Sequence, residues 1–425
     1  MEKALLVTIK LRAERDEWPM EDIAEELEEL TRSTGVEIVD NVMAMVDRPN
    51  PALFIGKGKA DEISLRALDE EVDTVIFSHD LSGTQQRNLE EVIGRKTIDR
   101  TQLILDIFAK HAKSPEGKTQ VELAQLQYLL PRLTGKGLIL SQQGAGIGTS
   151  GPGEKKLEMD RRRIRKKIDA LKDELRHMRL HRETMRKRRK ENRIPMVALV
   201  GYTNAGKSTL LNTLTDAGQR VHDGLFTTLD PLSKSMKLPN GETVVVSDTV
   251  GFLYDLPHHL IEAFKATLEE VTESDLLLHV LDISNPKAGE HYRAVMTVLG
   301  ELGLTEGENK KKIVTVLNKI DRVEDRVLLN VIARDYPDSV QISALTGRNV
   351  DALLERIEEF FASRTVCAEV KIPHKRMDLV NFFYEKGKVQ NVEYLQTSIK
   401  LNICLPKAIF LKISQDPDVR LSDKS

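Results

Sequence analysis

Cysteine and aromatic residues are scarce in this chain of 425 residues, and long apolar runs are missing. Cys367 and Cys404 are the only cysteines; they have no metal-ligand spacing and are too few for a disulfide framework, so we expect reduced thiols. No stretch approaches the roughly 18 apolar residues that a membrane helix needs. The apolar run near the N-terminus is too short, and too soon followed by charge, for a signal peptide. We therefore expect a cytoplasmic protein, and a monomer, rather than a membrane-spanning or disulfide-rich secreted one.

Charge is balanced over the whole chain but not along it. The formal net charge is −3, yet residues 154–193 contain 18 Lys and Arg against 8 Asp and Glu, a local +10 that leaves −13 for the rest. Such asymmetry between segments indicates a polyanionic partner.

Hydrophobic periodicity predicts an α/β protein with four parts. Residues 1–98 alternate strand-like and helix-like segments, which predicts a small α/β domain with a mostly parallel sheet. Residues 99–193 predict a long antiparallel helical hairpin with a glycine-rich tip loop at 134–153. Residues 194–362 repeat the α/β pattern, and residues 366–425 predict a small C-terminal α/β domain with strands and one helix.

The second helix of the hairpin carries a heptad seam. Its apolar residues are separated by 7, 4, 3, 4, 3 and 7 positions, which is the a/d spacing of a coiled coil. The seam consists of Leu157, Ile164, Ile168, Leu171, Leu175, Met178 and Met185. We expect it to pack against Val121, Ala124, Tyr128 and Leu129 of the preceding helix.

Residues 201–208, GYTNAGKS, match the phosphate-binding pattern G-x-x-x-x-G-K-[ST] between a strand and an apolar helix. Gly201 and Gly206 permit the tight loop whose N–H groups point at phosphate oxygens. Lys207 supplies a cation to the β- and γ-phosphates, and Ser208 supplies a hydroxyl to Mg²⁺. The helix N-terminus adds a favourable dipole. The segment therefore predicts a P-loop.

Three further motifs follow in order, each at the carboxyl end of a predicted strand, and together they predict a GTP site. In DTVG, Asp248 reaches Mg²⁺ through water and the Gly251 N–H meets the γ-phosphate. In NKID, Asp321 accepts from the guanine N1–H and 2-amino groups, Asn318 braces the loop and the Lys319 stem covers the base. In SAL, the Ala344 N–H donates to guanine O6, where adenine would present a donor. The predicted nucleotide site comprises Gly201, Tyr202, Thr203, Asn204, Ala205, Gly206, Lys207, Ser208, Thr209, Phe226, Thr227, Thr228, Asp248, Thr249, Val250, Gly251, Asn318, Lys319, Asp321, Ser343, Ala344 and Leu345.

A switch loop is predicted between the P-loop and DTVG. Thr228, with Thr227 as the neighbouring alternative, closes over Mg²⁺ in this prediction, so that the metal ligands are Ser208, Thr228 and Asp248. Lys207, Thr228 and Gly251 are the predicted catalytic residues.

Many GTPases carry a water-positioning Gln directly after the DxxG glycine, but here Phe252 occupies that position. Intrinsic hydrolysis should therefore be slow or depend on another group. Asn204 either holds K⁺ against the phosphates or only stabilises its loop.

The glycines at 146, 148 and 151 match a dinucleotide fingerprint but lack the strand and helix context it needs. An uncharged tip that enters an RNA-lined space, followed by a basic shaft that neutralises phosphates, explains the segment better. The alternative is a solvated helical face with a disordered loop. The predicted RNA-binding residues are Gly146, Gly148, Gly151, Lys155, Lys156, Arg161, Arg162, Arg163, Arg165 and Lys166.

These motifs resemble the HflX family of translational GTPases. The likeness rests on GYTNAGKSTLLN, FTTLDP and DTVGF, and more specifically on LSGTQQRNLE, DRTQLILDIFA, EGKTQVELAQLQYLLPRL and GIGTSGPGEKKLEMDRR, and it extends to about residue 362. Ser150 stands where the family usually has Arg, and Lys155 where Thr is common. The resemblance implies binding to the large ribosomal subunit, GTP-dependent splitting or rescue of stalled ribosomes under stress, and use of ATP with a second nucleotide site in the N-terminal domain.

Two other functions remain open from the sequence. One is an NTP-driven RNA-remodelling protein that uses ATP at its N-terminal domain. The other is a GTP-switched protein-binding module without an RNA partner. The basic helix would also attract an anionic membrane surface, although it has no exposed Trp or Phe face to insert.

Overall fold

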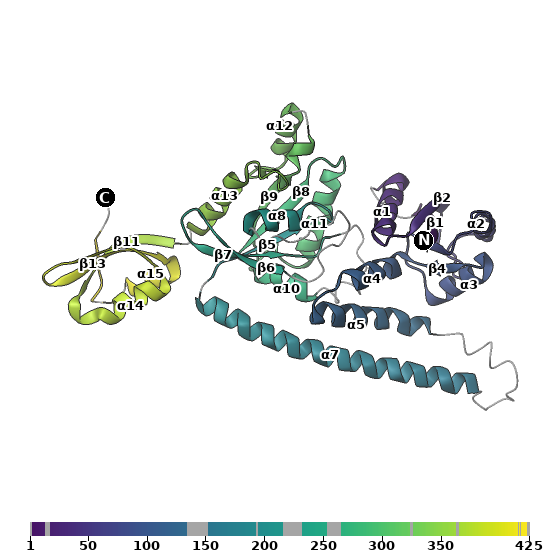
Figure 1. Ribbon diagram of the computed structural model, residues 1–425, viewed down its shortest axis with the longest axis horizontal. Coiled ribbons are helices and arrows are strands. Elements are labelled where there is room, and N and C mark those ends of the chain that lie inside the picture. The colour runs from purple at the N-terminus through teal and green to yellow at the C-terminus, as the bar shows by residue number, and fades with distance from the viewer. Residues whose placement is uncertain are drawn as a thin grey trace.

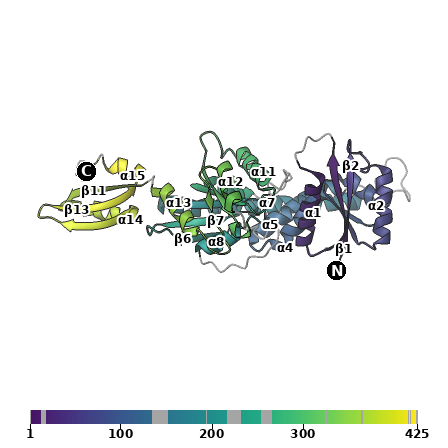
Figure 2. The same ribbon diagram turned by 90° about the horizontal axis from the view of Figure 1, so that it is seen from above.

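Three globular parts follow one another along the longest axis of the computed structural model, and a long helix runs beside the first two (Figures 1 and 2). In chain order the parts are an N-terminal domain, a P-loop domain and a C-terminal domain. The predicted α/β fold class is confirmed. The structure describes residues 2–12, 18–133, 152–192, 194–215, 232–252, 265–323, 326–362, 365–414, 416 and 418–422.

The N-terminal domain has a four-stranded sheet in the order β2-β1-β3-β4. All three strand pairs are parallel, as predicted. Ser82 begins helix α3 with a capping box: its hydroxyl accepts from the Gln85 N–H, and the Gln85 side chain accepts from the Ser82 N–H. The elements are β1 (Lys3–Leu11), α1 (Met20–Ser33), β2 (Glu37–Val46), α2 (Lys57–Asp69), β3 (Thr74–Phe77), α3 (Gly83–Ile93) and β4 (Lys96–Ile98).

The described helices between this domain and the next are α4 (Arg100–His111), α5 (Pro115–Arg132) and the 41-residue α7 (Pro152–Asn192). The helical stretch predicted before the tip loop is interrupted because Ser114 caps a new helix, with Pro115 at its first position. Helices α5 and α7 lie side by side in Figure 1 and form the predicted hairpin.

The seam predicted on α7 is confirmed for Ile164, Ile168, Leu171 and Leu175, and the partner face predicted on α5 is wrong. Ile168 and Leu171 are buried against Leu123, with Leu126 and Leu130 beside them. The partners predicted on α5, namely Val121, Ala124 and Tyr128, pack into the other core, with α4 and α1, and Leu129 is 43% exposed. Because α5 is covered on two sides, it has two apolar faces, and spacing alone does not say which one meets α7.

The P-loop domain has a six-stranded sheet in the order β10-β9-β8-β5-β7-β6. Only β6 runs antiparallel, and it was not predicted. The carboxyl ends of the parallel strands meet at one edge, so the motifs that follow them converge there. The elements are β5 (Met196–Gly201), α8 (Lys207–Thr215), β6 (Leu232–Lys237), β7 (Thr243–Asp248), α10 (Lys265–Glu273), β8 (Leu276–Asp282), α11 (Ala288–Glu301), β9 (Lys312–Asn318), η1 (Ile320–Arg322), α12 (Arg326–Asp335), β10 (Val340–Gln341) and α13 (Val350–Ala362).

The C-terminal domain is an antiparallel sheet in the order β12-β13-β11-β14, with helices inserted as βαββαβ. It contains two α-helices rather than the one predicted, and they pack with the sheet around a core of its own. The elements are β11 (Thr365–Pro373), η2 (His374–Arg376), α14 (Met377–Lys386), β12 (Lys388–Tyr394), β13 (Ser398–Pro406), α15 (Lys407–Ile413) and β14 (Arg420–Ser422).

The expectation of reduced thiols is wrong for this structure. Cys367 on β11 and Cys404 on β13 are directly paired in the strand register and joined by a disulfide. Their separation of 37 residues in sequence carried no information about this register. Within the ranges that the structure describes, no helix is long and apolar enough to span a membrane.

Candidate nucleotide-binding site

The phosphate loop needs glycine at two positions for different reasons. A Cβ on Gly201 would lie 2.3 Å from the carbonyl oxygen of Val280 on the neighbouring strand β8. Gly206 has φ +94°, and a Cβ there would lie 2.3 Å from Nδ2 of Asn318. Neighbouring strands therefore hold the loop so closely that a side chain at either position would displace backbone or the Asn318 side chain.

Lys207 lies at the start of α8, and its ammonium group is folded back over the loop. Nζ donates to the carbonyl oxygens of Gly201 at 3.1 Å and Tyr202 at 2.8 Å. Burial lowers the pKa of Lys207 to about 8, and the charge of Asp248 opposes that shift. Burial likewise lowers the pKa of His279, on β8, to about 3, so this imidazole is neutral and adds no charge beside the lysine. The site thus places one cation where phosphate would arrive.

Ser208 and Asp248, the two predicted metal ligands that the structure describes, lie against each other. The Ser208 hydroxyl donates to Oδ2 of Asp248 at 2.6 Å, and Asp248 is fully buried at the end of β7. The adjacent Thr249 hydroxyl donates to the Leu199 carbonyl at 2.6 Å, which ties the DTVG turn to β5. A hydroxyl and a carboxylate are the oxygen ligands that Mg²⁺ prefers, so these residues fit the ion.

The wall that would face the γ-phosphate is built from Gly251 and Phe252. A Cβ on Gly251 would lie 2.7 Å from Cγ2 of Thr203 and 3.1 Å from Nζ of Lys207. Phe252 is buried, and its backbone is held by two hydrogen bonds: its N–H donates to the Gly201 carbonyl at 3.1 Å, and the Thr203 N–H donates to its carbonyl at 2.9 Å. A buried phenyl ring does not orient water, so the chain lacks the usual group at this position.

The NKID and SAL motifs meet the P-loop from β9 and β10. Asn318 Nδ2 donates to the Ala205 carbonyl at 2.8 Å, and the Ala344 N–H donates to Asn318 Oδ1 at 2.9 Å. Lys319 Nζ donates to the Asn204 carbonyl at 2.8 Å and pairs with Asp282 at 2.7 Å. The Ala344 N–H that we assigned to guanine O6 is thus engaged by Asn318 here. The Asp321 side chain is exposed on η1.

The structure brings the P-loop, DTVG, NKID and SAL residues to one edge of the sheet, although Leu345 points outward and is 74% exposed. The predicted switch residues Phe226, Thr227 and Thr228 lie outside the described residues. So do the tip glycines 146, 148 and 151, Ser150, and the side chains of residues 155–157 and 185.

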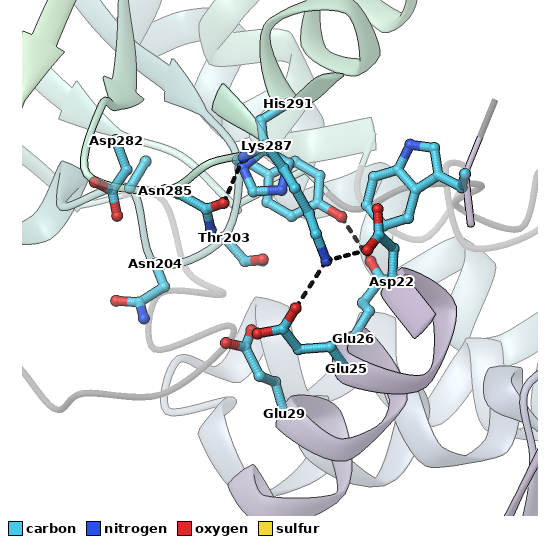
Figure 3. Close-up of a pocket in the computed structure, with 13 residues that line it drawn as sticks. Asp22, Glu25, Glu26, Glu29, Thr203, Asn204, Asp282, Asn285, Lys287 and His291 are labelled. Atoms are coloured by element: carbon cyan, nitrogen blue, oxygen red, sulfur yellow. Dashed lines mark hydrogen bonds and ion pairs between the residues drawn. The ribbon is translucent and has the colours of Figure 1, made fainter. Parts of the chain in front are cut away.

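Helix α1 of the N-terminal domain contacts the P-loop, which sequence reasoning missed. Glu26 accepts from the Tyr202 hydroxyl at 2.6 Å and pairs with Arg100 at 3.0 Å through its other oxygen. The Tyr202 ring stacks on His291 of α11 at 3.9 Å between centroids. Lys287 pairs with Asp22 at 2.9 Å and with Glu25 at 2.7 Å. A residue of the phosphate loop is therefore anchored to another domain (Figure 3).

Beside this contact, a cleft of about 60 Å³ lies between α1 and the P-loop. Glu25 and Glu29 face Thr203 and Asn204 across it (Figure 3). Burial, followed by the charges of Glu25 and Glu26, raises the pKa of Glu29. The sequence did carry a signal, since acidic residues at 22, 25, 26 and 29 recur at helical spacing and predict one acidic face.

Helix α7 carries the basic residues that were predicted to follow the tip loop. Arg162, Arg163, Arg165 and Lys166 are exposed, and Arg161 is half-buried. Nearer its C-terminal end the helix is tied to α10, because Glu269 lies 3.4 Å from Arg179 and 3.5 Å from Arg182. Arg182 also pairs with Glu116 of α5 at 2.9 Å. These contacts join the end of the hairpin that is distant from the tip loop to helix α10 of the P-loop domain.

Four family descriptions match successive parts of the chain. They are "GTP-binding GTPase N-terminal" at residues 21–109, "GTP-binding GTPase Middle Region" at 111–189, "50S ribosome-binding GTPase" at 196–319 and "HflX C-terminal domain" at 329–409. The sequence motifs indicated a resemblance up to about residue 362. The family match extends further towards the C-terminus, to residue 409.

Curated relatives resemble the chain over nearly its whole length. GTPase HflX of Caldanaerobacter subterraneus subsp. tengcongensis is 45% identical over 400 residues, covering 94% of this chain and 90% of the relative. The same-named protein of Lacrimispora saccharolytica is 43% identical over 417 residues, covering 98% and 96%, and that of Escherichia coli is 39% identical over 408 residues, covering 95% and 94%. A solved GTP-binding protein of Sulfolobus solfataricus in complex with GDP is 26% identical, covers 85% of this chain and 98% of that chain, and has a TM-score of 0.44.

Proposed function

The chain belongs to the HflX family of GTPases, and we propose that it binds the large ribosomal subunit in the cytoplasm and promotes the splitting or rescue of stalled ribosomes under stress. One matching family description reads "50S ribosome-binding GTPase", and it covers the P-loop domain. The proposal joins two properties of the chain, a GTPase site and a basic helix that is tied to it.

Residues of the chain perform the steps around the phosphates. Lys207 would exchange its two carbonyl partners for phosphate oxygens, and Ser208 and Asp248 would hold Mg²⁺, which would neutralise phosphate charge when bound. Gly251 would present its N–H to the γ-phosphate, and Thr228 is the residue that we propose as the further Mg²⁺ ligand. Because Phe252 is buried and apolar, the group that orients water must come from elsewhere. A GTPase built in this way is slow until a partner supplies or positions that group.

The ion pairs of Glu269 are the observation that carries the proposal. Glu269 lies on α10, the first described helix after DTVG, and it holds Arg179 and Arg182 of α7. A change at the γ-phosphate that moves α10 would therefore act on the helix that carries the basic shaft. Conversely, docking of α7 on RNA would act on the segment that faces the γ-phosphate, because coupling between two sites is reciprocal.

The exposed cations on α7 are suited to ribosomal RNA. Arg162, Arg163, Arg165 and Lys166 lie within five consecutive positions, little more than one helical turn, and their side chains are exposed. Guanidinium groups make bidentate hydrogen bonds to phosphate, and each neutralised phosphate releases counterions. A long basic helix that ends in a glycine-rich loop would reach into a narrow RNA-lined space.

Asn204 lies at the exposed tip of the phosphate loop with φ 58°. Its backbone carbonyl is engaged by Lys319, which leaves the side-chain amide to face the phosphates or a cation beside them. We therefore include K⁺ as an activating ion in the proposal, with Na⁺ as the comparison.

The test is GTP turnover with and without purified large ribosomal subunits, in potassium and in sodium buffer. It compares the intact chain with a variant that lacks residues 135–153. We expect stimulation of the intact chain and a weakened or abolished response in the deletion variant. Failure of the subunits to stimulate the intact chain would overturn the proposal and favour a GTP-switched protein-binding module. Phosphate release from ATP in the same assay measures whether ATP is a second substrate.

A further inference from the structure

The two cysteines of the chain lie on the face of the C-terminal sheet that the helices leave open. Successive side chains along β13 lie on opposite faces of the sheet. Ile399, Leu401 and Ile403 are buried in the core with α14 and α15, so Cys404 lies on the other face. Cys367 is its direct partner on β11. The disulfide is therefore placed outside the core of the domain.

The two sulfur atoms differ in access. Cys367 is an exposed residue near the start of β11, shortly after α13 ends at Ala362. Cys404 is only 9% exposed, and Nε2 of Gln390 lies 3.3 Å from its Sγ. A small thiol or disulfide in solution therefore reaches Cys367 first, and Cys404 is the sulfur that leaves or attacks from within.

The core of the domain does not depend on the bond. Val370, Ile372, Phe383, Ile399 and Leu401 are buried to 3% exposure or less on the helix side of the sheet. Breaking the disulfide removes no apolar group from this core and opens no cavity in it. The dithiol form can thus keep the fold, which is what a reversible bond requires.

We propose that Cys367 and Cys404 form a reversible thiol–disulfide pair that exchanges with low-molecular-weight disulfides and thiols. In oxidation, the Cys367 thiolate attacks one sulfur of a small disulfide, which forms a mixed disulfide and releases one small thiolate. The Cys404 thiolate then attacks Sγ of Cys367 and releases the second small thiolate. The protein loses two electrons and two protons, and the small disulfide becomes two thiols. Reduction runs through the same mixed disulfide.

The bond ties β11 to β13 close to the connection between the P-loop and C-terminal domains (Figure 1). It closes a loop across 37 residues of sequence, which limits the conformations of the unfolded C-terminal segment. Oxidation should therefore make unfolding of the sheet formed by β11, β12, β13 and β14 less favourable and leave the stability of the P-loop domain unchanged. The effect of the bond is confined to the C-terminal domain.

The first test counts free thiols in the native full-length chain by alkylation and mass spectrometry across a series of reduced-to-oxidised glutathione ratios. We expect one transition in which both cysteines change together, without denaturant. Independent modification of the two cysteines, or a bond that is reduced only in denaturant, would overturn the proposal.

Matched single variants test the order of attack. Cys404→Ser retains the exposed sulfur and should form a mixed disulfide with glutathione disulfide at least about tenfold faster than Cys367→Ser, which retains the shielded one. Equal rates, or the reverse order, would contradict the assignment.

Hydrogen exchange measures the consequence of the bond. Amides of β11 to β14 should be protected by up to roughly a thousandfold more in the oxidised chain, the limit that loop closure sets. The Cys367→Ser/Cys404→Ser chain should match reduced wild type and ignore reductant, with P-loop domain amides as the internal reference. Identical protection of oxidised and reduced wild type would contradict the proposed effect.

Discussion

At the scale of single residues, the environment of Lys207 gives the nucleotide site a dependence on pH. Its ammonium group is buried and bonded to carbonyl oxygens, and its pKa lies at about 8. Phosphate binding needs the charged form of Lys207. At a pH where part of the nucleotide-free protein has lost the Lys207 proton, GTP binding should therefore be accompanied by uptake of a proton.

We therefore predict that GTP affinity falls about fourfold between about pH 7 and pH 8.5, because the charged fraction of a lysine with a pKa near 8 falls by that factor. The range stops short of guanine ionisation. Calorimetric titration at several pH values measures the effect. In Lys207→Arg, whose guanidinium stays charged, the pH dependence should vanish whatever the affinity, and a flat profile for the wild type would contradict the prediction.

The same lowered pKa affects folding in the opposite direction. The unfolded chain binds the Lys207 proton up to its ordinary pKa of 10.5, whereas the nucleotide-free folded chain releases it near 8. Between these values the unfolded state holds more protons, so this residue makes the folded state more stable as pH rises. Nucleotide binding and folding should therefore respond to alkaline pH with opposite signs.

Asp321 is the residue that we expect to select guanine. Its exposed carboxylate stands on η1 beside Asn318 and Lys319, which are fixed to the P-loop. Asp321→Asn presents a donor to the 2-amino group of GTP and should weaken GTP binding by roughly 100-fold. Xanthosine triphosphate, which has an oxygen there, should gain affinity. Competition of both nucleotides against a fluorescent GDP analogue measures the exchange; equal loss for both would indicate misfolding instead.

At the scale of elements, α1 and the phosphate loop form one polar contact across two domains. Glu26, Arg100 and the Tyr202 hydroxyl lie together with little exposure. Burying a carboxylate is unfavourable unless it is paired and hydrogen-bonded, and here both oxygens have partners.

We predict that Glu26→Ala lowers the free energy of unfolding by about 3 kcal/mol, since it removes the carboxylate that pairs with buried Arg100. Glu26→Gln should cost less, because it keeps an acceptor. Glu25→Ala is the matched control on the same helix: Glu25 is 67% exposed, and its bond to Lys287 should contribute about 0.5 kcal/mol. Urea unfolding gives the three values, and equal losses at 25 and 26 would contradict this account.

The pairing of α10 with α7 makes a separate prediction about function. Glu269→Gln removes the charge that Arg179 and Arg182 share, so basal GTP turnover should change less than about twofold while ribosome stimulation falls about fivefold. Glu301→Gln, an exposed carboxylate on α11, is the control with the same change in charge. Unchanged stimulation in Glu269→Gln would remove this contact from the proposed coupling.

At the scale of the whole molecule, the uneven distribution of charge decides how the chain should approach RNA. The exposed arginines of α7 lie beside two domains on a chain whose remainder is acidic. Acidic domains should repel RNA and leave the helix as the point of contact. Attraction of this kind weakens as salt rises.

We predict that affinity for large ribosomal subunits falls linearly with salt on logarithmic axes. Arg162→Gln/Arg163→Gln should make that slope shallower by about one to two, since each lost phosphate contact contributes somewhat less than one. Lys310→Gln/Lys311→Gln removes the same charge from a loop of the P-loop domain and should leave the slope unchanged. Binding measured by sedimentation at several salt concentrations separates the two variants.

The sequence by itself determined the local features of this protein. The order of strand, GYTNAGKS and helix predicted the β5–α8 turn, and hydrophobic spacing predicted the parallel sheet of the N-terminal domain and the central part of the α7 seam. These features were readable because they depend on residues close together in the chain: a loop that needs glycine, a cap, or a period of 3.6 or 2 residues.

Only the tertiary structure decided which distant residues meet. Glu26 and Tyr202 are 176 residues apart, and Cys367 and Cys404 are joined by a strand register that no local pattern specifies. The face of α5 that meets α7 was misassigned for the same reason, because a helix covered on both sides has two apolar faces. Contacts between elements depend on how whole surfaces fit together, and that information is spread over the entire chain rather than held in any one segment.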